Sequence, residues 1–161
     1  MAEKVVKTAI LLLILAVLYS FSGCSEKMHT FEKDGMSITL SDDFKEKQSN
    51  NTACYESSNA VVLVKKEGFA AMSDAGLSPD ISAAEYSELV AKSNGLDVSV
   101  TEENEIVYFE YNMDTDFGNF KYFACVYKGS DAFWLIQFSC SADIYDDVKD
   151  EFFTFAQSVK V

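Results

Sequence analysis

Arginine is absent from this 161-residue sequence, and proline and histidine occur once each, as Pro79 and His29. Thirteen lysines stand against 26 aspartates and glutamates, which leaves a formal net charge of −13. Because nucleic-acid phosphates need a basic face, this balance excludes nucleic acid as a partner. The missing guanidinium groups also remove the side chain best suited to a bidentate grip on carboxylate or phosphate.

Catalytic and metal-binding motifs are missing as well. A single histidine without a neighbouring cysteine does not make a zinc site, and the sequence has no Gly-x-Ser-x-Gly elbow, phosphate loop or His-Glu-x-x-His motif. Asp114, Asp116 and Gly118 resemble half of a calcium loop, but the distal glutamate is absent. We therefore expect a hairpin turn there, and we expect no metal, no cofactor and no catalytic residue in the chain.

The first residues are apolar in a way that predicts export. Two lysines precede the apolar run 9–18, and Phe21-Ser-Gly-Cys24 follows it. The run is shorter than the roughly 20 residues of a membrane-spanning helix, which favours a signal peptide over residues 1–23. Small residues before a cysteine resemble the bacterial lipobox, and that resemblance implies that Cys24 is lipidated. An ordinary secretory signal that is cleaved elsewhere is the alternative.

Residues 24–30 are short and polar, which predicts a tether between the lipid and a single domain over residues 31–161. The six residues after Cys24, Ser25 to Thr30, span at most roughly 20 Å, so the domain is expected close to the membrane surface. The predicted location is the bacterial cell membrane, with the domain lipid-anchored and facing outside the cytoplasm.

Two neighbouring runs, 119–128 and 131–140, are apolar at almost every position. A strand with one wet face alternates, so these two strands are expected in the middle of a covered sheet. Gly129-Ser130 between them predicts a two-residue type II′ turn. This register places Cys125 opposite Trp134.

Three cysteines lie in strand-like runs, namely Cys54, Cys125 and Cys140. An odd number leaves at least one free thiol, and buried cysteine usually behaves as a small hydrophobe. In the predicted register Cys125 and Cys140 are offset by roughly 20 Å along the strands. A disulfide needs Cα atoms within roughly 7 Å, so none is expected between these two. Pairing of Cys54 with either remains open.

Further strands are predicted at 52–57, 60–66, 98–101 and 106–112, after a hairpin over residues 31–40 that turns at Asp34-Gly35. Gln137 interrupts the apolar run 131–140. We expect its side chain to hydrogen-bond a neighbouring strand, and a ligand pocket at this position is the alternative.

Two helices complete the pattern. Ser82 and Glu85 form a capping box that opens the first helix, and Gly95 ends it. Ser141 or Asp143 is expected to cap the second, whose bulky apolar residues recur at helical spacing as far as Val159. The second helix is expected to cover one face of the sheet, and the first helix the other face or an edge. The predicted fold class is α+β, an antiparallel β-sheet sandwiched by helices.

The connection 67–80 has no clear period and contains the only proline. Loops held by a rigid scaffold often carry function. Phe69, Met72 and Leu77 are therefore predicted as a candidate binding loop, because exposed methionine and aromatic side chains are common at adaptable contact surfaces. The alternative is that these three side chains fold back and fill one end of the core.

Gly35-Met-Ser-Ile-Thr-Leu40, Asp131-Ala-Phe-Trp134 and the aromatic closing helix that ends at Ser158-Val together resemble small bacterial lipoproteins of the PsbP-like fold family. The resemblance spans roughly residues 30–161. It implies an antiparallel sheet between helices and a non-enzymatic binding or assembly role, and it supplies no catalytic residue.

Two functions are compatible with the sequence. The first is a membrane-anchored, extracytoplasmic binding or accessory module whose partner is a protein or a small molecule. The second is a hydrolytic or metal-assisted enzyme with an unrecognised site among the acidic loops. The absence of catalytic motifs and the lipobox-like cysteine favour the first.

Overall fold

The computed structural model describes residues 27–161. The predicted signal peptide and Cys24 lie outside this range. Thirteen elements follow along the chain: β1 (Met28–Lys33), β2 (Met36–Ser41), β3 (Lys45–Glu46), β4 (Ala53–Glu56), β5 (Ala60–Gly68), α2 (Phe69–Asp74), α3 (Ala83–Ser93), β6 (Thr101–Glu103), β7 (Ile106–Thr115), β8 (Gly118–Lys128), β9 (Ala132–Ser141), the 3₁₀ turn η1 (Ala142–Ile144) and α4 (Tyr145–Gln157).

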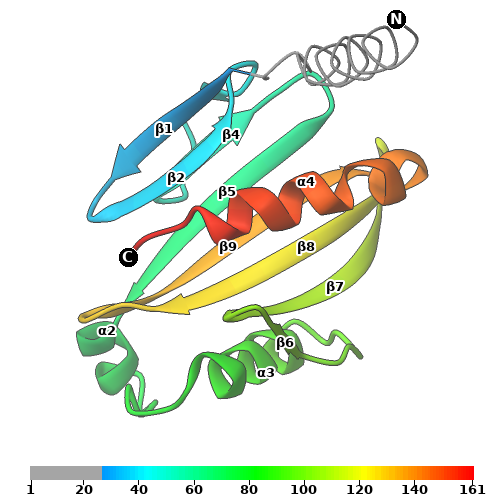
Figure 1. The fold of residues 1–161 in the computed structure, drawn as a ribbon. Helices are drawn as coiled ribbons and strands as arrows, with labels where there is room; N and C mark the ends of the chain where they lie inside the picture. Colours follow the sequence, from blue (N-terminus) through cyan, green and yellow to red (C-terminus); the bar gives the residue numbers. More distant parts are fainter. Residues whose placement is uncertain (1–26) are drawn as a thin grey trace, which may run out of the picture.

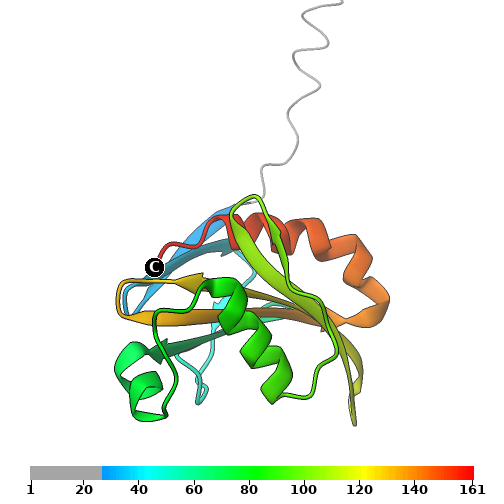
Figure 2. The same cartoon turned by 90° about the horizontal axis from the view of Figure 1, so that it is seen from below.

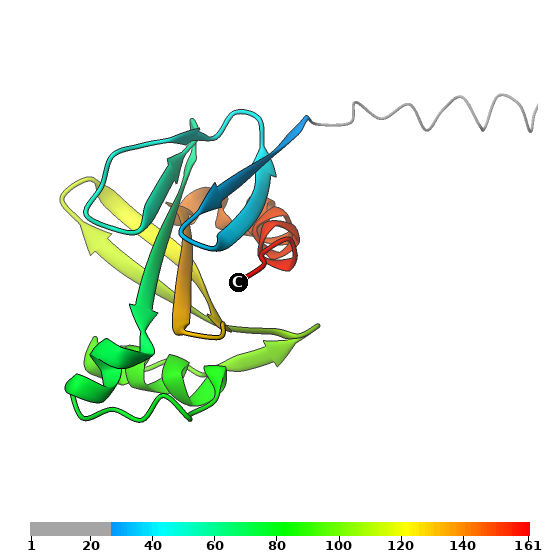
Figure 3. The same ribbon diagram turned by 90° about the vertical axis from the view of Figure 1, so that its left-hand side faces the viewer.

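Seven strands form one antiparallel sheet in the order β3-β4-β5-β9-β8-β7-β6, and β1 and β2 form a separate hairpin. α4 and the β1–β2 hairpin lie on one face of this sheet, whereas α2 and α3 lie on the other (Figure 1 and Figure 3). The predicted fold class, an antiparallel sheet between helices, is confirmed.

The two apolar runs predicted at the centre of the sheet are β8 and β9, and they occupy its middle. Phe123, Ala124 and Ile136 are fully buried, because helical or hairpin layers cover both faces at this point. Continuous apolar sequence is therefore explained by two-sided burial.

The predicted two-residue turn at Gly129-Ser130 is wrong. Lys128 pairs with Phe133, and the N–H of Gly129 donates to the Ala132 carbonyl at 2.9 Å, so the turn is centred on Ser130 and Asp131, one residue later than predicted. Gly129 does not have a positive φ. A Cβ added to Gly129 would lie 3.3 Å from Nε1 of Trp134, so close packing against the indole explains the glycine.

The later turn shifts the hairpin register by two residues, which keeps each side chain on its predicted face. Cys125 lies opposite Ile136, not opposite Trp134. Cys140 lies opposite Lys121, an offset from Cys125 of roughly 13 Å along the strands. Cys54, Cys125 and Cys140 are free thiols among the described residues.

α3 begins and ends as predicted. The Ser82 hydroxyl accepts from the Glu85 N–H, and the Glu85 carboxylate accepts from the Ser82 N–H, which completes the capping box. Gly95 follows with φ +67°, a left-handed conformation that glycine adopts without a Cβ clash.

The start of α4 differs from the prediction, since neither Ser141 nor Asp143 caps it. The 3₁₀ turn η1 runs directly into the helix and puts Ile144 at the N-cap position with φ −108° and ψ −1°. A side-chain cap needs an extended backbone at that position, and here the backbone is already turned.

Two boundaries also move. β1 begins at Met28, which pairs with Ser41 of β2. Residues 28–30 of the predicted tether therefore belong to the folded domain. The strand predicted at 98–101 is instead β6, residues 101–103, while Val98 and Val100 pack against the α3 side of the core.

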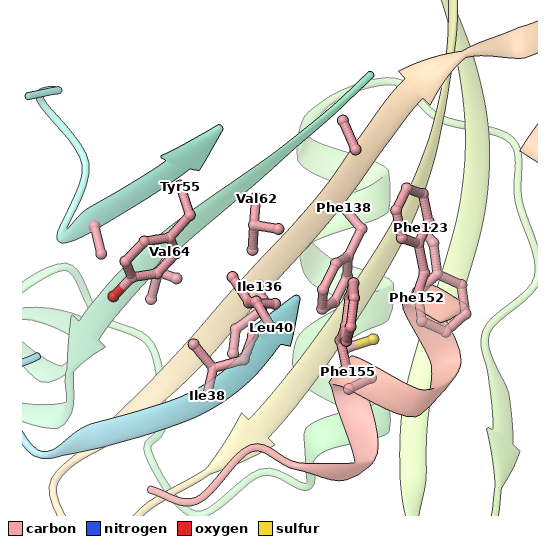
Figure 4. Packing of buried hydrophobic residues seen from close by; sticks show 14 of the residues in the cluster. Ile38, Leu40, Tyr55, Val62, Val64, Phe123, Ile136, Phe138, Phe152 and Phe155 are labelled. Atoms are coloured by element: carbon pink, nitrogen blue, oxygen red, sulfur yellow. The ribbon is translucent and has the colours of Figure 1, made fainter. Parts of the chain in front are cut away.

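The larger core lies between the sheet and α4. Phe123 of β8 and Phe138 of β9 meet Phe152 and Phe155 of α4 (Figure 4), and the Phe138 and Phe152 ring centroids are 5.4 Å apart. Full burial of each such ring stabilises the fold by roughly 1.5–3 kcal/mol. This layer anchors the sheet from which the candidate site is built.

Candidate binding site

α3 lies across only part of its face of the sheet, and the β7–β8 hairpin extends beyond it (Figure 2). On the uncovered part Leu63, Phe120 and Tyr122 are only half-buried, and Met113 is 43% exposed. A pocket of about 350 Å³ lies where α3 ends over the sheet. Its apolar lining comes from α3 and the chain after it (Val90, Leu96) and from the sheet (Phe109, Met113, Leu135).

Two local features create this pocket. The left-handed turn at Gly95 ends α3 and sends Leu96 back toward the helix, where its N–H donates to the Ala91 carbonyl at 2.9 Å. Beneath it, Ala124 of β8 stands between Phe109 of β7 and Gln137 of β9 in the sheet register. A methyl group at this central position leaves space that a larger side chain would fill.

The floor of the pocket carries a hydrogen-bonded pair. Nε2 of Gln137 donates to the Tyr111 hydroxyl oxygen at 2.7 Å across β8. The predicted bond from Gln137 to a neighbour in the sheet is confirmed, and the same residue also lines the pocket. No other described residue bonds to the Tyr111 hydroxyl hydrogen or to the side-chain amide oxygen (Oε1) of Gln137, so one donor and one acceptor remain for a ligand.

Tyr111 is held in place by stacking. Its ring lies 4.6 Å from the Tyr122 ring with an interplanar angle of 4°. Burial, with a further contribution from Tyr122, raises the pKa of Tyr111 to about 12. The phenol is therefore neutral at physiological pH and acts as a hydrogen-bond donor, not as a base.

Glu67 forms the charged rim of the pocket. It accepts from the Tyr86 hydroxyl at 2.5 Å and pairs with Lys65 at 2.5 Å. Partial burial opposes ionisation, but the bonds from Lys65 and Tyr86 outweigh it, so the pKa of Glu67 lies below its usual value. The Glu67 carboxylate therefore bonds to Tyr86 of α3 and to Lys65 of β5, and it links the helix to the sheet.

Tyr86 strengthens the same link. Its ring stacks on Phe133 at 4.3 Å with an interplanar angle of 5°, and burial followed by the Glu67 carboxylate raises its pKa. The N-terminal half of α3 is thus fixed to the sheet, whereas its C-terminal end borders the pocket.

The three residues predicted as a binding loop are placed differently from one another. Phe69 and Met72 belong to the short helix α2, Met72 is buried, and Phe69 packs edge-on against Phe133 at 5.4 Å. Leu77 is 45% exposed. None of them lines the pocket. The expected exposure thus holds for Leu77 but not for Met72, because one turn of helix directs Phe69 and Met72 toward the sheet.

The acidic positions that resembled half of a calcium loop form a tight turn. Asp116 and Phe117 connect the Thr115–Gly118 pair, and the Thr115 hydroxyl accepts from the Phe117 N–H at 3.1 Å. The predicted hairpin turn is confirmed. Within residues 27–161 no three His, Cys, Asp or Glu side chains gather so that they could hold a metal ion.

His29 lies in β1 with its ring 4.6 Å from Phe31, and it is exposed. The thiols are not activated: burial raises the pKa of Cys54, Cys125 and Cys140. No helix within residues 27–161 is long and apolar enough to cross a membrane.

Comparison with solved structures identifies the fold. The chain is similar to cyanobacterial PsbP (CyanoP) from Synechocystis, with a TM-score of 0.55 and 14% identity over 88% of this chain and 99% of that one. It is also similar to a protein from Bacteroides thetaiotaomicron, with a TM-score of 0.53 and 9% identity over 84% of this chain and 48% of the other.

A third similar structure is LpqN, involved in cell envelope biogenesis of Mycobacterium tuberculosis, with a TM-score of 0.47 and 10% identity over 83% of this chain and 90% of that one. No family model and no curated protein matches the sequence. At such low identity the CyanoP match shows the fold, which is PsbP-like, and leaves function to be argued from the site.

Sequence reasoning found Gln137 but missed the rest of the pocket. Tyr111 and Met113 alternate with Glu110, Asn112 and Asp114, a pattern that equally describes the core-facing side of a strand with one wet face, so it gave no reason to separate them from core residues. The position of α3 over half of the sheet decides which of these side chains is left uncovered, and this long-range placement leaves no local signal.

Proposed function

We propose that this chain is a membrane-anchored, extracytoplasmic accessory protein that binds a partner and catalyses no reaction. The pocket at the end of α3 is the single observation that carries the proposal. It combines apolar walls with a fixed hydrogen-bonding pair, Tyr111 and Gln137, and this combination is typical of binding sites. The PsbP-like fold is compatible with the proposal but does not by itself specify a function.

The chemistry of the pocket lining favours binding over catalysis. Tyr111 keeps its proton because its pKa is about 12. Glu67 is held by Tyr86 and Lys65, and the Ser93 hydroxyl donates to the Leu89 carbonyl. The lining therefore offers hydrogen bonds and apolar contact, but no activated nucleophile paired with a base.

The membrane anchor is supported by the sequence, through the short apolar run and Ser22-Gly-Cys24. Intact-mass analysis of the protein from bacterial membranes tests it. We expect a diacylglyceryl-modified Cys24 at the new N-terminus, and we expect Cys24→Ser to block both lipid attachment and normal processing. An unmodified Cys24, or cleavage at another residue, would rule out the lipid anchor.

Site-specific photo-cross-linking in the native membrane tests the binding role. A benzophenone side chain at Ser93, on the pocket rim, is expected to capture one defined partner. The matched control is the same group at Asp150, which is exposed on α4 across the sheet. Equal capture from both positions, or none from Ser93, would contradict a binding role for the pocket.

A further inference from the structure

The outer edge of β7 is mostly unpaired. β7 pairs with β8 along its length, but β6 pairs only with residues 106–108. The pair Thr115–Gly118 closes a two-residue hairpin, and antiparallel alternation then directs the main-chain N–H and C=O groups of Glu110, Asn112 and Asp114 away from β8. No other described segment makes a main-chain hydrogen bond to these three residues.

The two faces of this edge differ in chemistry. Tyr111 and Met113 point to the α3 face and line the pocket. Glu110, Asn112 and Asp114 point to the opposite face, where Glu110 pairs with Lys149 at 2.7 Å and Asp114 is exposed. Lys121 of β8 lies opposite Asn112 on this face. An added strand would therefore meet apolar groups on one side and, on the other, the Glu110–Lys149 pair, Lys121 and the carboxylate of Asp114, which forms no ion pair with a described residue.

We propose that the outer edge of β7 accepts an extended segment of a partner protein in which apolar residues alternate with lysine or arginine. The added strand forms main-chain hydrogen bonds with Glu110, Asn112 and Asp114, as in other strand additions to a sheet edge. Its apolar side chains lie beside Tyr111 and Met113 at the open side of the pocket. Its cationic side chains lie on the face that carries Asp114 and the Glu110–Lys149 pair, in keeping with the net charge of −13.

A second copy of this chain is a poor occupant of the same edge. Two β7 strands paired antiparallel about Asn112 would place Glu110 of each copy directly opposite Asp114 of the other. Like charges opposite one another destabilise a strand pair. The acidic edge thus disfavours self-association and favours a basic partner.

This inference rests on the proposed function and names the partner of the same site. The probe is the peptide acetyl-Lys-Val-Lys-Val-Lys-amide, whose lysines match Glu110, Asn112 and Asp114 in antiparallel register. Titration of the full chain in detergent micelles, followed by NMR of the main-chain amides, measures the affinity. We expect the Glu110, Asn112 and Asp114 amide protons to become protected from exchange as the peptide binds.

Asn112→Pro gives the sharpest variant, because it removes an outward N–H without removing a bond to β8. We expect the affinity for the peptide to fall at least about tenfold in Asn112→Pro and to stay within about twofold in the matched variant Asn112→Ala. A peptide N-methylated at its central lysine is expected to lose affinity for the unaltered protein in the same way. That peptide decides the question if Asn112→Pro does not fold.

Three results would overturn strand addition: full affinity in a folded Asn112→Pro protein, full affinity of the N-methylated peptide, or equal binding of acetyl-Val-Val-Lys-Lys-Lys-amide, which has the same composition without alternation. The proposed function fails separately. If Asn112→Pro leaves the capture of a partner at Ser93 unchanged, strand addition at β7 is wrong and the binding role of the pocket stands. If the peptide binds but nothing is captured at Ser93, strand addition stands and the proposed binding role of the pocket is wrong.

Discussion

At its centre the α4 face of the sheet is closed, whereas the α3 face is covered over only part of its area. On the α4 face the rings of Phe123, Phe138 and Phe152 are almost completely buried. On the α3 face Leu63 and Tyr122 stay half-buried, and a pocket opens at the end of the helix. A small domain that concentrates its stabilising contacts in one layer can leave apolar groups uncovered in the other.

The largest effect is expected from Phe138→Ala on the closed face. Phe138 is fully buried and contacts Phe152 and Phe155, so truncation leaves a cavity and should lower the free energy of unfolding by about 3–5 kcal/mol. Urea denaturation measures this value. Leu89→Ala, at a 40% exposed position on α3, is the control and should change it by no more than about 0.5 kcal/mol. Equal losses in both variants would contradict the distinction between the faces.

A second large effect is expected where the α3 face is closed. The double change Phe69→Ser and Met72→Ser removes one buried and one half-buried apolar side chain that pack near Phe133, and should cost about 2–4 kcal/mol. Urea unfolding and capture at Ser93 are measured together. Unchanged stability with lost capture would instead support the predicted binding loop at Phe69, Met72 and Leu77.

The polar contact between α4 and β7 should give a smaller, pH-dependent effect. Lys149 lies 2.7 Å from Glu110, and partial burial of Glu110 is outweighed by bonds from Lys149 and Tyr145, which leave its pKa below the usual 4.5. A carboxyl whose pKa is lower in the folded than in the unfolded protein stabilises the fold at pH values above its unfolded pKa. The contribution of Glu110 is therefore lost as the pH falls below about 4.5 and through its folded pKa.

Lys149→Met tests this contact. At pH 7 we expect it to cost about 1 kcal/mol, a modest value because solvent screens the half-exposed pair. Urea unfolding repeated at pH 3.5 should show a smaller difference between the variant and the unaltered protein. The raised pKa of Lys149, caused mainly by its bond to Glu110, keeps the amine charged across this whole range. A difference that does not change with pH would show that Glu110 is not its partner.

The smallest effect on stability is expected at the open end of the α3 face. Met113 is 43% exposed, so Met113→Ser should change the free energy of unfolding by at most about 0.5 kcal/mol. The same substitution removes an apolar wall of the pocket and should weaken peptide binding several-fold. Thermal melting measures the effect on stability, and peptide titration measures the effect on binding. A sharp fall in melting temperature would mean that Met113 is buried and that this face is closed.

The fold class was predictable from the sequence because its signals are local. Continuous apolar runs identified β8 and β9 as central strands, and the Ser82–Glu85 box and Gly95 marked both ends of α3. The loop after β8 was mispredicted because glycine can serve either a turn with positive φ or close packing. Only the position of Trp134 distinguishes the two roles.

The site was much less predictable. Gln137 stood out as a polar residue in an apolar run, but its partner Tyr111 lies 26 residues away in sequence and across an intervening strand. The uncovered state of Met113 depends on where α3 ends above the sheet. Such long-range placements are set by tertiary packing, which single-strand patterns do not encode.

The separate β1–β2 hairpin also has a mechanical consequence. β2 is fastened to residues 158–160 by the Ser37–Lys160 bridge and by the bond between Ser158 and Thr39, whereas β1 pairs with β2 as its single strand partner within residues 27–161. Both open ends of this hairpin, Met28 and Ser41, lie together. A force applied at residue 27 would break the residue pairs between β1 and β2 sequentially, beginning with Met28–Ser41. β1 would then peel away from β2 over roughly 20 Å, and the contacts of Phe31 with Tyr55 and of Lys33 with Glu46 would be the points at which tension passes to the large sheet.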